Sequence, residues 1–195
     1  MTSLLLIALF VPAAPAADED DPEPPVKTGL VTRLVAKKST YSLDFGGKKK
    51  EDYLTAAKAG TLESPKVDLE LVIANYTKET IRIRSTGGTN RLMLKLEGDG
   101  AVSATVMVDA VRPPTQYSVL EPKEKLTIPI QQLSSLARVL KSQTTETRLY
   151  WTEPGDYKLS ASLYTQMTTD FGGPNPVARN QTFEAKAITL KVEEK

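Results

Sequence analysis

The sequence contains no histidine and no cysteine in its 195 residues. Protein sites for zinc, copper and haem depend mainly on these two side chains. Serine and cysteine nucleophiles of the common triads also need histidine as their base. Proton switching through imidazole and redox switching through thiols are excluded as well. Any catalysis would have to rely on carboxylates, Lys, Ser, Thr or Tyr.

An excess of charge of one sign is also missing. The chain has 25 Lys and Arg against 24 Asp and Glu, a net charge of +1. A nearly neutral chain has no overall electrostatic attraction to nucleic acid or to anionic lipid. We therefore expect no nucleic-acid partner, and a protein or a polysaccharide is the partner class to consider. The sequence indicates no catalytic, cofactor-binding or metal-binding residue, and we expect no cofactor.

No hydrophobic run is long enough to span a bilayer, which takes about twenty residues. The apolar run Leu4–Val11 is far shorter, and Ala14-Pro15-Ala16 follows it. Signal peptidase cleaves after small residues at this spacing. We expect residues 1–16 to be a signal peptide, which makes the protein secreted or periplasmic. A buried N-terminal strand or helix is the alternative, but the polar residues from Ala17 onward disfavour it.

Residues 17–28 are predicted to form an acidic, proline-rich leader. Ala17–Pro25 reads Ala-Asp-Glu-Asp-Asp-Pro-Glu-Pro-Pro, and charge repulsion together with proline favours an extended, disordered chain. We interpret the segment as a solvated linker, and a tether for Ca²⁺ or for a partner is the alternative. Residues 29–195 are long enough to bury a core without disulfides, and we predict one domain.

The segment that follows Pro154-Gly155 predicts one half-buried strand of an antiparallel sheet. Apolar and polar residues alternate strictly along it, so one face is predicted to be buried and the other exposed to solvent. The residues of the buried face are Tyr157, Leu159, Ala161 and Leu163, and those of the exposed face are Lys158, Ser160, Ser162 and Tyr164.

The same period of two recurs along the chain and predicts about eight strands with no βαβ alternation. This pattern indicates an all-β fold, an immunoglobulin-like antiparallel β-sandwich with one or two short helices. Between two of the runs, Asn75–Glu79 is predicted to be the turn of a hairpin or a sandwich corner. The other runs are Leu30–Phe45, Val67–Ile73, Thr80–Arg84, Leu92–Leu96, Val102–Val108, Leu126–Ile130 and Phe183–Val192.

Two helices and one long loop complete the predicted elements. Glu51–Ala59 is predicted to be a short helix that Gly60 terminates. A second helix is predicted from Leu133, Leu136 and Leu140, which have helical spacing. Thr165–Asn180 is predicted to be a loop with the stiff centre Gly172–Pro176.

The segment Tyr150–Tyr157 reads Tyr-Trp-Thr-Glu-Pro-Gly-Asp-Tyr. It resembles the core motif of uncharacterised bacterial exported proteins that carry an immunoglobulin-like β-sandwich domain. The resemblance spans Leu30 to Val192, and it departs at Pro122-Lys123, where many related domains have Pro-Gly. It implies a fold and a compartment but no activity, because one fold hosts many functions.

Two aromatic residues of this motif are candidates for a site. Tyr157 is interpreted as the corner tyrosine that bonds to loop backbone in Greek-key sandwiches, or as plain core; ligand stacking is the alternative. Trp151, the single tryptophan, is interpreted as core packing beside the turn. Its alternative role is to stack on a sugar or to anchor a partner, and a carbohydrate-binding module would need it exposed.

Three carboxylates in predicted turns are the formal candidates for catalysis. A glycosidase needs two carboxylates that flank a cleft, but no motif connects Glu97, Asp99 and Glu153. The runs Glu97–Gly100 and Thr169–Gly173 supply too few oxygens for a Ca²⁺ loop and are interpreted as turns. We predict that the protein is not an enzyme.

The predicted function is that of a secreted, non-catalytic accessory or binding module. Pro129 lacks an amide hydrogen, so Leu126–Ile130 is predicted to be an edge strand, or to have its N–H side free. Such an edge is a place for a partner strand to pair. The first alternative is a proteinase-inhibitor-like domain that uses Gly172–Pro176, and the second is a carbohydrate-binding module that uses Trp151.

Overall fold

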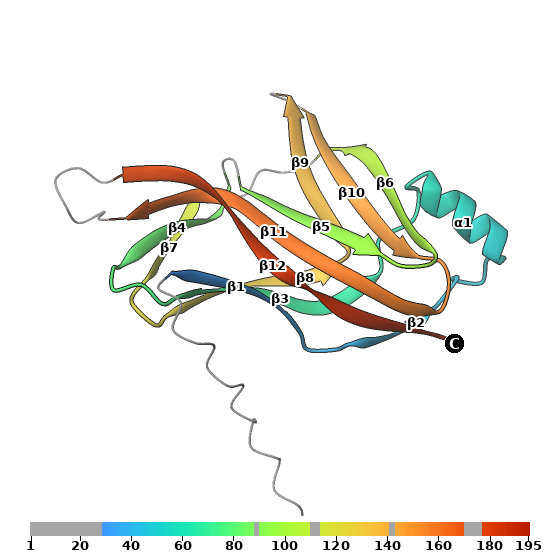
Figure 1. Cartoon of the computed structure of the whole chain (residues 1–195). Helices are drawn as coiled ribbons and strands as arrows, with labels where there is room; N and C mark the ends of the chain where they lie inside the picture. Colours follow the sequence, from blue (N-terminus) through green and yellow to red (C-terminus); the bar gives the residue numbers. More distant parts are fainter. Residues whose placement is uncertain (1–28, 88–89, 110–113, 141–142, 170–176) are drawn as a thin grey trace, which may run out of the picture.

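The structure, a computed structural model, describes residues 29–87, 90–109, 114–140, 143–169 and 177–195 (Figure 1). Strands make up most of this part of the chain, and one short helix, α1 (Lys50–Lys58), lies at one end. The expected signal peptide and acidic leader, residues 1–28, lie outside the described residues. Among the helices described, none has the length and apolar character needed to cross a membrane.

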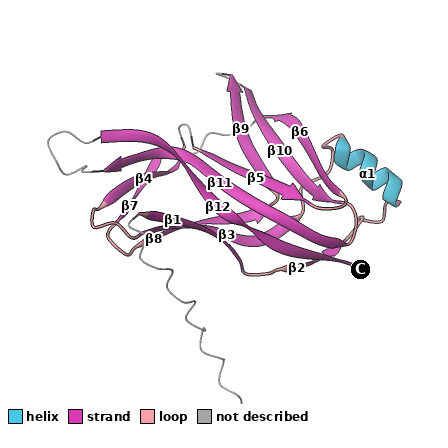
Figure 2. Ribbon diagram, viewed as in Figure 1, coloured by secondary structure: helices cyan, strands magenta, loops and turns pink. Residues whose placement is uncertain are grey.

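In the described part of the chain, twelve strands form three hydrogen-bonded groups (Figure 2). One group has the order β1-β3-β8, a second has the order β6-β10-β9, and the largest has the order β2-β12-β11-β4-β7 with β5 also paired to β11. All pairs are antiparallel except β2 with β12. The bounds are β1 Leu30–Ala36, β2 Thr40–Leu43, β3 Lys66–Asn75, β4 Ile81–Thr86, β5 Arg91–Glu97, β6 Ala101–Val108, β7 Gln116–Leu120, β8 Lys125–Gln132, β9 Ser134–Leu140, β10 Gln143–Trp151, β11 Gly155–Thr169 and β12 Val177–Glu194.

One hydrophobic core lies between the β1-β3-β8 sheet and the largest sheet. Its fully buried side chains include Leu71 and Ile73 of β3 and Leu159 and Leu190 of β11 and β12. On β11 the buried and accessible residues alternate as predicted from the sequence. The predicted fold class, an all-β antiparallel sandwich, is confirmed.

The chain changes sheets at Asn75–Glu79, so of the two predicted alternatives the sandwich corner is the correct one. Asn75 is completely buried. Its side-chain nitrogen lies 2.8, 3.0 and 3.2 Å from the carbonyl oxygens of Glu79, Leu120 and Glu121. Its side-chain oxygen accepts hydrogen bonds from the amide and the hydroxyl of Thr77. One side chain therefore joins the corner to the turn between β7 and β8.

The first predicted helix is confirmed as α1, and the chain passes through Gly60 with φ +68° just after it. The second predicted helix is wrong, because Ser134–Leu140 is strand β9. Residues 134–140 pair with β10, and this cross-strand pairing favours an extended chain over a helix. The leucines do not share one buried face either, since Leu133 is fully buried and Leu136 is half exposed.

The predicted loop Thr165–Asn180 is also wrong over most of its length. β11 continues to Thr169 and β12 begins at Val177, and the two strands remain paired up to these residues. Threonine and glutamine fit a solvated strand, so the absence of large apolar residues here did not indicate a loop. The segment Gly172–Pro176 lies outside the described residues.

We expect Asn75→Ala to lower the free energy of unfolding by about 2–4 kcal/mol, since it removes the donor to the buried Leu120 carbonyl and to two partly buried carbonyls. Asn180→Ala, at an exposed position of β12, is the matched control and should change it by less than about 0.5 kcal/mol. Urea denaturation of both variants measures the difference. Equal stabilities would contradict the structural role of Asn75.

Candidate functional site

Trp151 is a core residue rather than a binding platform. Its side chain is only 3 % exposed, and it lies between the rings of Tyr41 and Tyr157 at centroid distances of 5.3 and 6.2 Å. An open hollow of about 550 Å³ lies beside it, but Trp151 presents almost no surface there. The core interpretation is confirmed. The proposed sugar platform at Trp151 is wrong, because a ring that solvent cannot reach cannot stack on a sugar.

Tyr157 is the predicted corner tyrosine. Its ring is fully buried, and its hydroxyl donates a hydrogen bond to the Glu153 carbonyl at 2.7 Å. This bond closes the chain across the Pro154-Gly155 turn. The structural interpretation is therefore confirmed over the alternative of ligand stacking.

The Glu97–Gly100 segment is a turn that packs on this corner. A Cβ on Gly98 would lie 2.9 Å from the carbonyl oxygen of Asp156, and one on Gly100 would lie 2.8 Å from the Glu153 side chain. Both glycines have positive φ, so this turn needs them for its backbone and for its close approach. The second predicted turn extends into residues 170–173, which lie outside the described residues.

Two of the three candidate carboxylates, Glu97 and Glu153, are paired with lysines. Glu97 lies 2.5 Å from Lys95, and the hydrogen bond and charge of this lysine lower the pKa of Glu97. Glu153 forms an ion pair with Lys50 at 3.1 Å. A general acid needs a raised pKa instead. Within the described ranges, no group of three or more acidic residues is placed to hold a metal ion.

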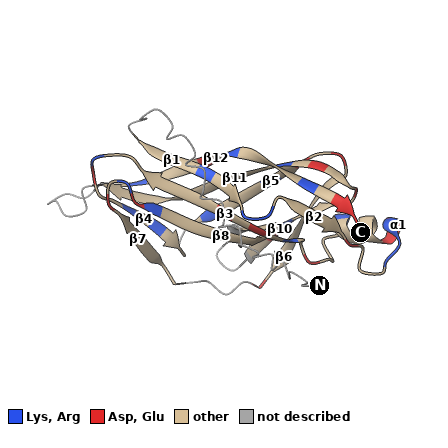
Figure 3. Cartoon of the chain, turned by 90° about the horizontal axis from the view of Figure 1, so that it is seen from below, with Lys and Arg blue, Asp and Glu red and all other residues tan. Residues whose placement is uncertain are grey.

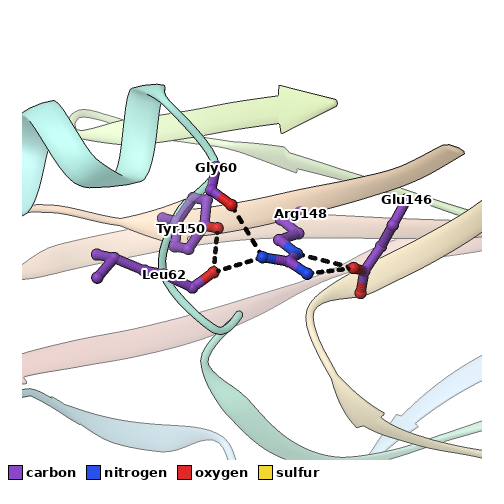
Figure 4. A network of polar contacts seen from close by, with 5 residues as sticks. All are labelled: Gly60, Leu62, Glu146, Arg148 and Tyr150. Atoms are coloured by element: carbon purple, nitrogen blue, oxygen red, sulfur yellow. Dashed lines mark hydrogen bonds and ion pairs between the residues drawn. The ribbon is translucent and has the colours of Figure 1, made fainter. Parts of the chain in front are cut away.

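A polar network on β10 attaches the segment after α1 to the outside of the β6-β10-β9 sheet (Figure 4). Arg148 donates to the carbonyls of Gly60 and Leu62 at 2.8 and 3.1 Å, and to Glu146 at 2.7 Å. The Tyr150 hydroxyl donates to Leu62 at 2.7 Å. Because these donors are satisfied within the fold, the network positions α1. The sequence shows its charged and aromatic residues at alternate positions of one strand but not their distant partners.

The β8 strand is an edge strand, as predicted, because within the described ranges it pairs only with β3. Hydrogen bonds around β3 show which way each residue points. On the β1 side, the Lys37 amide donates to the Asp68 carbonyl and the Tyr76 amide donates to the Gly29 carbonyl. On the β8 side, the Asn75 amide donates to the Glu124 carbonyl. Backbone groups alternate sides along a strand. Odd-numbered residues of β3 therefore face β8.

This alternation places the imide nitrogen of Pro129 on the open side of the sheet. Pro129 lies opposite Glu70, an even-numbered residue of β3 whose backbone groups face β1. The open edge thus lacks a donor at its centre, between Thr127 and Gln131. A proline there is a common protection against pairing along a whole edge. The predicted free N–H side is confirmed, and it disfavours continuous strand addition at β8.

The outer face of the largest sheet carries a group of arginines and exposed apolar side chains. Residues directly paired across strands share one face, and even-numbered residues of β11 point outward. Figure 3 shows basic residues on β4. We call this surface the arginine face, and it comprises Arg82 and Arg84 of β4, Arg91 and Met93 of β5, Tyr117 and Val119 of β7, and Tyr164 and Gln166 of β11.

Tyr117 holds two of these arginines. The Arg82 guanidinium lies 4.1 Å from the centroid of the Tyr117 ring, and that of Arg84 lies at 5.5 Å. Arg84 also donates to the Tyr117 hydroxyl at 3.1 Å and to Gln166 at 2.5 Å. Stacking on a ring restricts a guanidinium without removing its charge.

The arginine face combines positive charge with exposed apolar surface. The residues directly opposite Arg82 are Val119 and Thr168, which are uncharged. Val119 is 48 % exposed and Met93 is 45 % exposed. Tyrosine, arginine and methionine are enriched where proteins bind one another. The net charge of +1 gives no sign of this surface, because acidic residues elsewhere balance its arginines. The alternating run Arg82-Ile83-Arg84 is the signal in the sequence that could have indicated it.

Comparison with known proteins gives little beyond this geometry. No family model matches the chain, and no curated protein matches it. Among solved structures it is similar to the cupredoxin domain of amoB from Nitrosocaldus yellowstonii, with 10 % identity and a TM-score of 0.26. The match covers 86 % of this chain and 88 % of that chain. So slight a similarity indicates nothing about what this protein binds.

We expect Tyr157→Phe to destabilise the fold by about 1–2 kcal/mol, because it removes the donor to the partly buried Glu153 carbonyl. Tyr164→Phe is the matched control, since Tyr164 lies on the same strand but on its outer, accessible face. It should change the free energy of unfolding by less than about 0.5 kcal/mol. Thermal unfolding of the two variants compares them, and an equal effect would contradict the corner role of Tyr157.

Burial raises the pKa of four tyrosines, Tyr41, Tyr53, Tyr150 and Tyr157. The folded state therefore holds these protons more tightly than the unfolded chain does. Their contribution to stability is complete below about pH 10 and is lost as the pH rises through the folded-state values. We expect an ultraviolet titration to show a late phenolate phase that denaturant abolishes. The same curve with and without denaturant would contradict this.

Proposed function

We propose that this protein is an exported, non-catalytic binding module that recognises an acidic segment of a partner protein on its arginine face. The observation that carries the proposal is the stacking of Arg82 and Arg84 on Tyr117, beside apolar residues that solvent reaches. Export is supported by the sequence of residues 1–16.

The chemistry of this face favours carboxylates. A guanidinium presents paired N–H donors that match a carboxylate, and such charge-assisted bonds are stronger than neutral ones. Arg82 and Arg84 occupy alternate positions of one strand, so their spacing suits an extended peptide with acidic residues at alternate positions. Because Tyr117 already restrains both guanidinium groups, binding orders them at less entropic cost.

The same face is poorly suited to a polysaccharide. Sugar binding on a sheet commonly uses the open face of an aromatic ring. Here the Arg82 guanidinium lies over the Tyr117 ring at 4.1 Å and occupies the face that a sugar would need. The exposed Val119 and Met93 add apolar surface without hydrogen-bonding groups. A protein segment that carries both acidic and apolar side chains fits this combination.

The proteinase-inhibitor alternative stays a prediction. Its loop, Gly172–Pro176, lies outside the described residues.

We expect Arg82→Gln with Arg84→Gln to raise the Kd for a fluorescein-labelled oligoglutamate peptide by about tenfold, measured by fluorescence anisotropy at low salt. The binding should also weaken as salt is added, because the charges are at the surface.

The matched control is Lys48→Gln with Lys49→Gln, which removes two charges from the exposed segment before α1. It should leave the Kd nearly unchanged. If both double variants weaken binding equally, net charge rather than the arginine face holds the peptide, and the proposal fails. Thermal unfolding checks that each variant is folded.

A further inference from the structure

The sequence itself contains an acidic segment of the kind that the arginine face would bind. Ala17–Pro25 carries the carboxylates of Asp18, Glu19, Asp20, Asp21 and Glu23 and no basic residue. These carboxylates are opposite in charge to the guanidinium groups of Arg82, Arg84 and Arg91.

The described chain begins close to the strand that carries two of those arginines. The Gly29 carbonyl accepts a hydrogen bond from the Tyr76 amide at 3.0 Å, and Leu30 lies opposite Asn75. Tyr76 belongs to the sandwich corner, which leads directly into β4 and Arg82. The leader therefore joins the domain at the corner that precedes the arginine face.

The leader is also long enough to reach this face. Pro25 is four residues and Ala17 twelve residues before Gly29, so the acidic stretch can extend about 13–40 Å from the corner. The two sheets of a sandwich are only about 10 Å apart. The chain can thus pass from β1 around the corner to the outside of the neighbouring sheet.

Three lysines near the corner are weaker competitors for the leader. Lys78, Lys123 and Lys125 lie in or next to the turns there, and acidic neighbours alternate with them in the sequence. Glu79 directly follows Lys78, and Glu124 lies between Lys123 and Lys125. On the arginine face, by contrast, the cross-strand neighbours of Arg82 are uncharged.

We propose that the acidic leader docks on the arginine face of its own chain and competes there with the partner. This inference rests on the proposed function, because it concerns the same surface. A tethered segment acts at a high effective concentration, so a weak contact is enough to occupy the face. A partner segment must then displace the leader. Only a partner whose affinity for the arginine face is high enough to outcompete the tethered leader will bind.

The experiment uses the absence of cysteine in the sequence. In the processed protein, Pro22→Cys gives one site for a nitroxide spin label and changes no charge. We expect paramagnetic broadening of the backbone amide signals of Arg82, Arg84 and Tyr117 in the NMR spectrum. Thr127 and Val72, paired on the outer face of the opposite sheet, are the reference, and their signals should be much less affected.

The same label in an Arg82→Gln, Arg84→Gln background should lose this broadening, and so should the parent protein at high salt. Equal broadening on both faces, or broadening that neither change removes, would overturn the inference.

This result is independent of the oligoglutamate titration. If the label shows no contact while Arg82→Gln with Arg84→Gln still weakens peptide binding, the docking of the leader is wrong and the proposed function stands. As a second measurement, replacing Asp20, Asp21 and Glu23 by their amides should lower the Kd of the peptide, because the competitor is removed. An unchanged Kd contradicts the competition.

Discussion

The side chain of Asn75 is the interaction on which the rest of this structure depends. It is completely buried where the chain leaves one sheet for the other, and it bonds to the corner and to the turn between β7 and β8. A buried amide that meets several carbonyls stabilises one geometry, since any shift would leave polar groups without partners. The relative position of the two sheets therefore depends on one buried polar residue.

The surface that we propose to bind a partner follows from this corner. β4 begins directly after it, and β7 ends at the turn that Asn75 holds. Arg82 and Tyr117 consequently come to lie on neighbouring strands, close enough for the guanidinium to stack on the ring. The described chain begins at the same corner, and the proposed docking of the acidic leader rests on this position. The corner and the arginine face both lie at this end of the sandwich.

The opposite end has a different character, although the sequence drew more attention to it. Trp151 and Tyr157 are conspicuous aromatic residues in a motif with a turn, but both are buried and one closes the turn with its hydroxyl. The carboxylates nearby are paired with lysines. Large aromatic residues beside a turn are what a sandwich needs to fill its end, so their prominence in the sequence reflects folding.

The sequence by itself determined the class of fold and the strands whose apolar and polar residues alternate clearly, because this alternation is a local property of each segment. It also determined the hydroxyl bond of Tyr157, whose acceptor is only four residues away. Only the tertiary structure decided that Ser134–Leu140 is a strand, that Asn75–Glu79 is a corner and that Arg82 meets Tyr117. Each of these depends on a partner far along the chain. Spacing within a segment cannot specify such partners, since pairing is set by the packing of the whole domain.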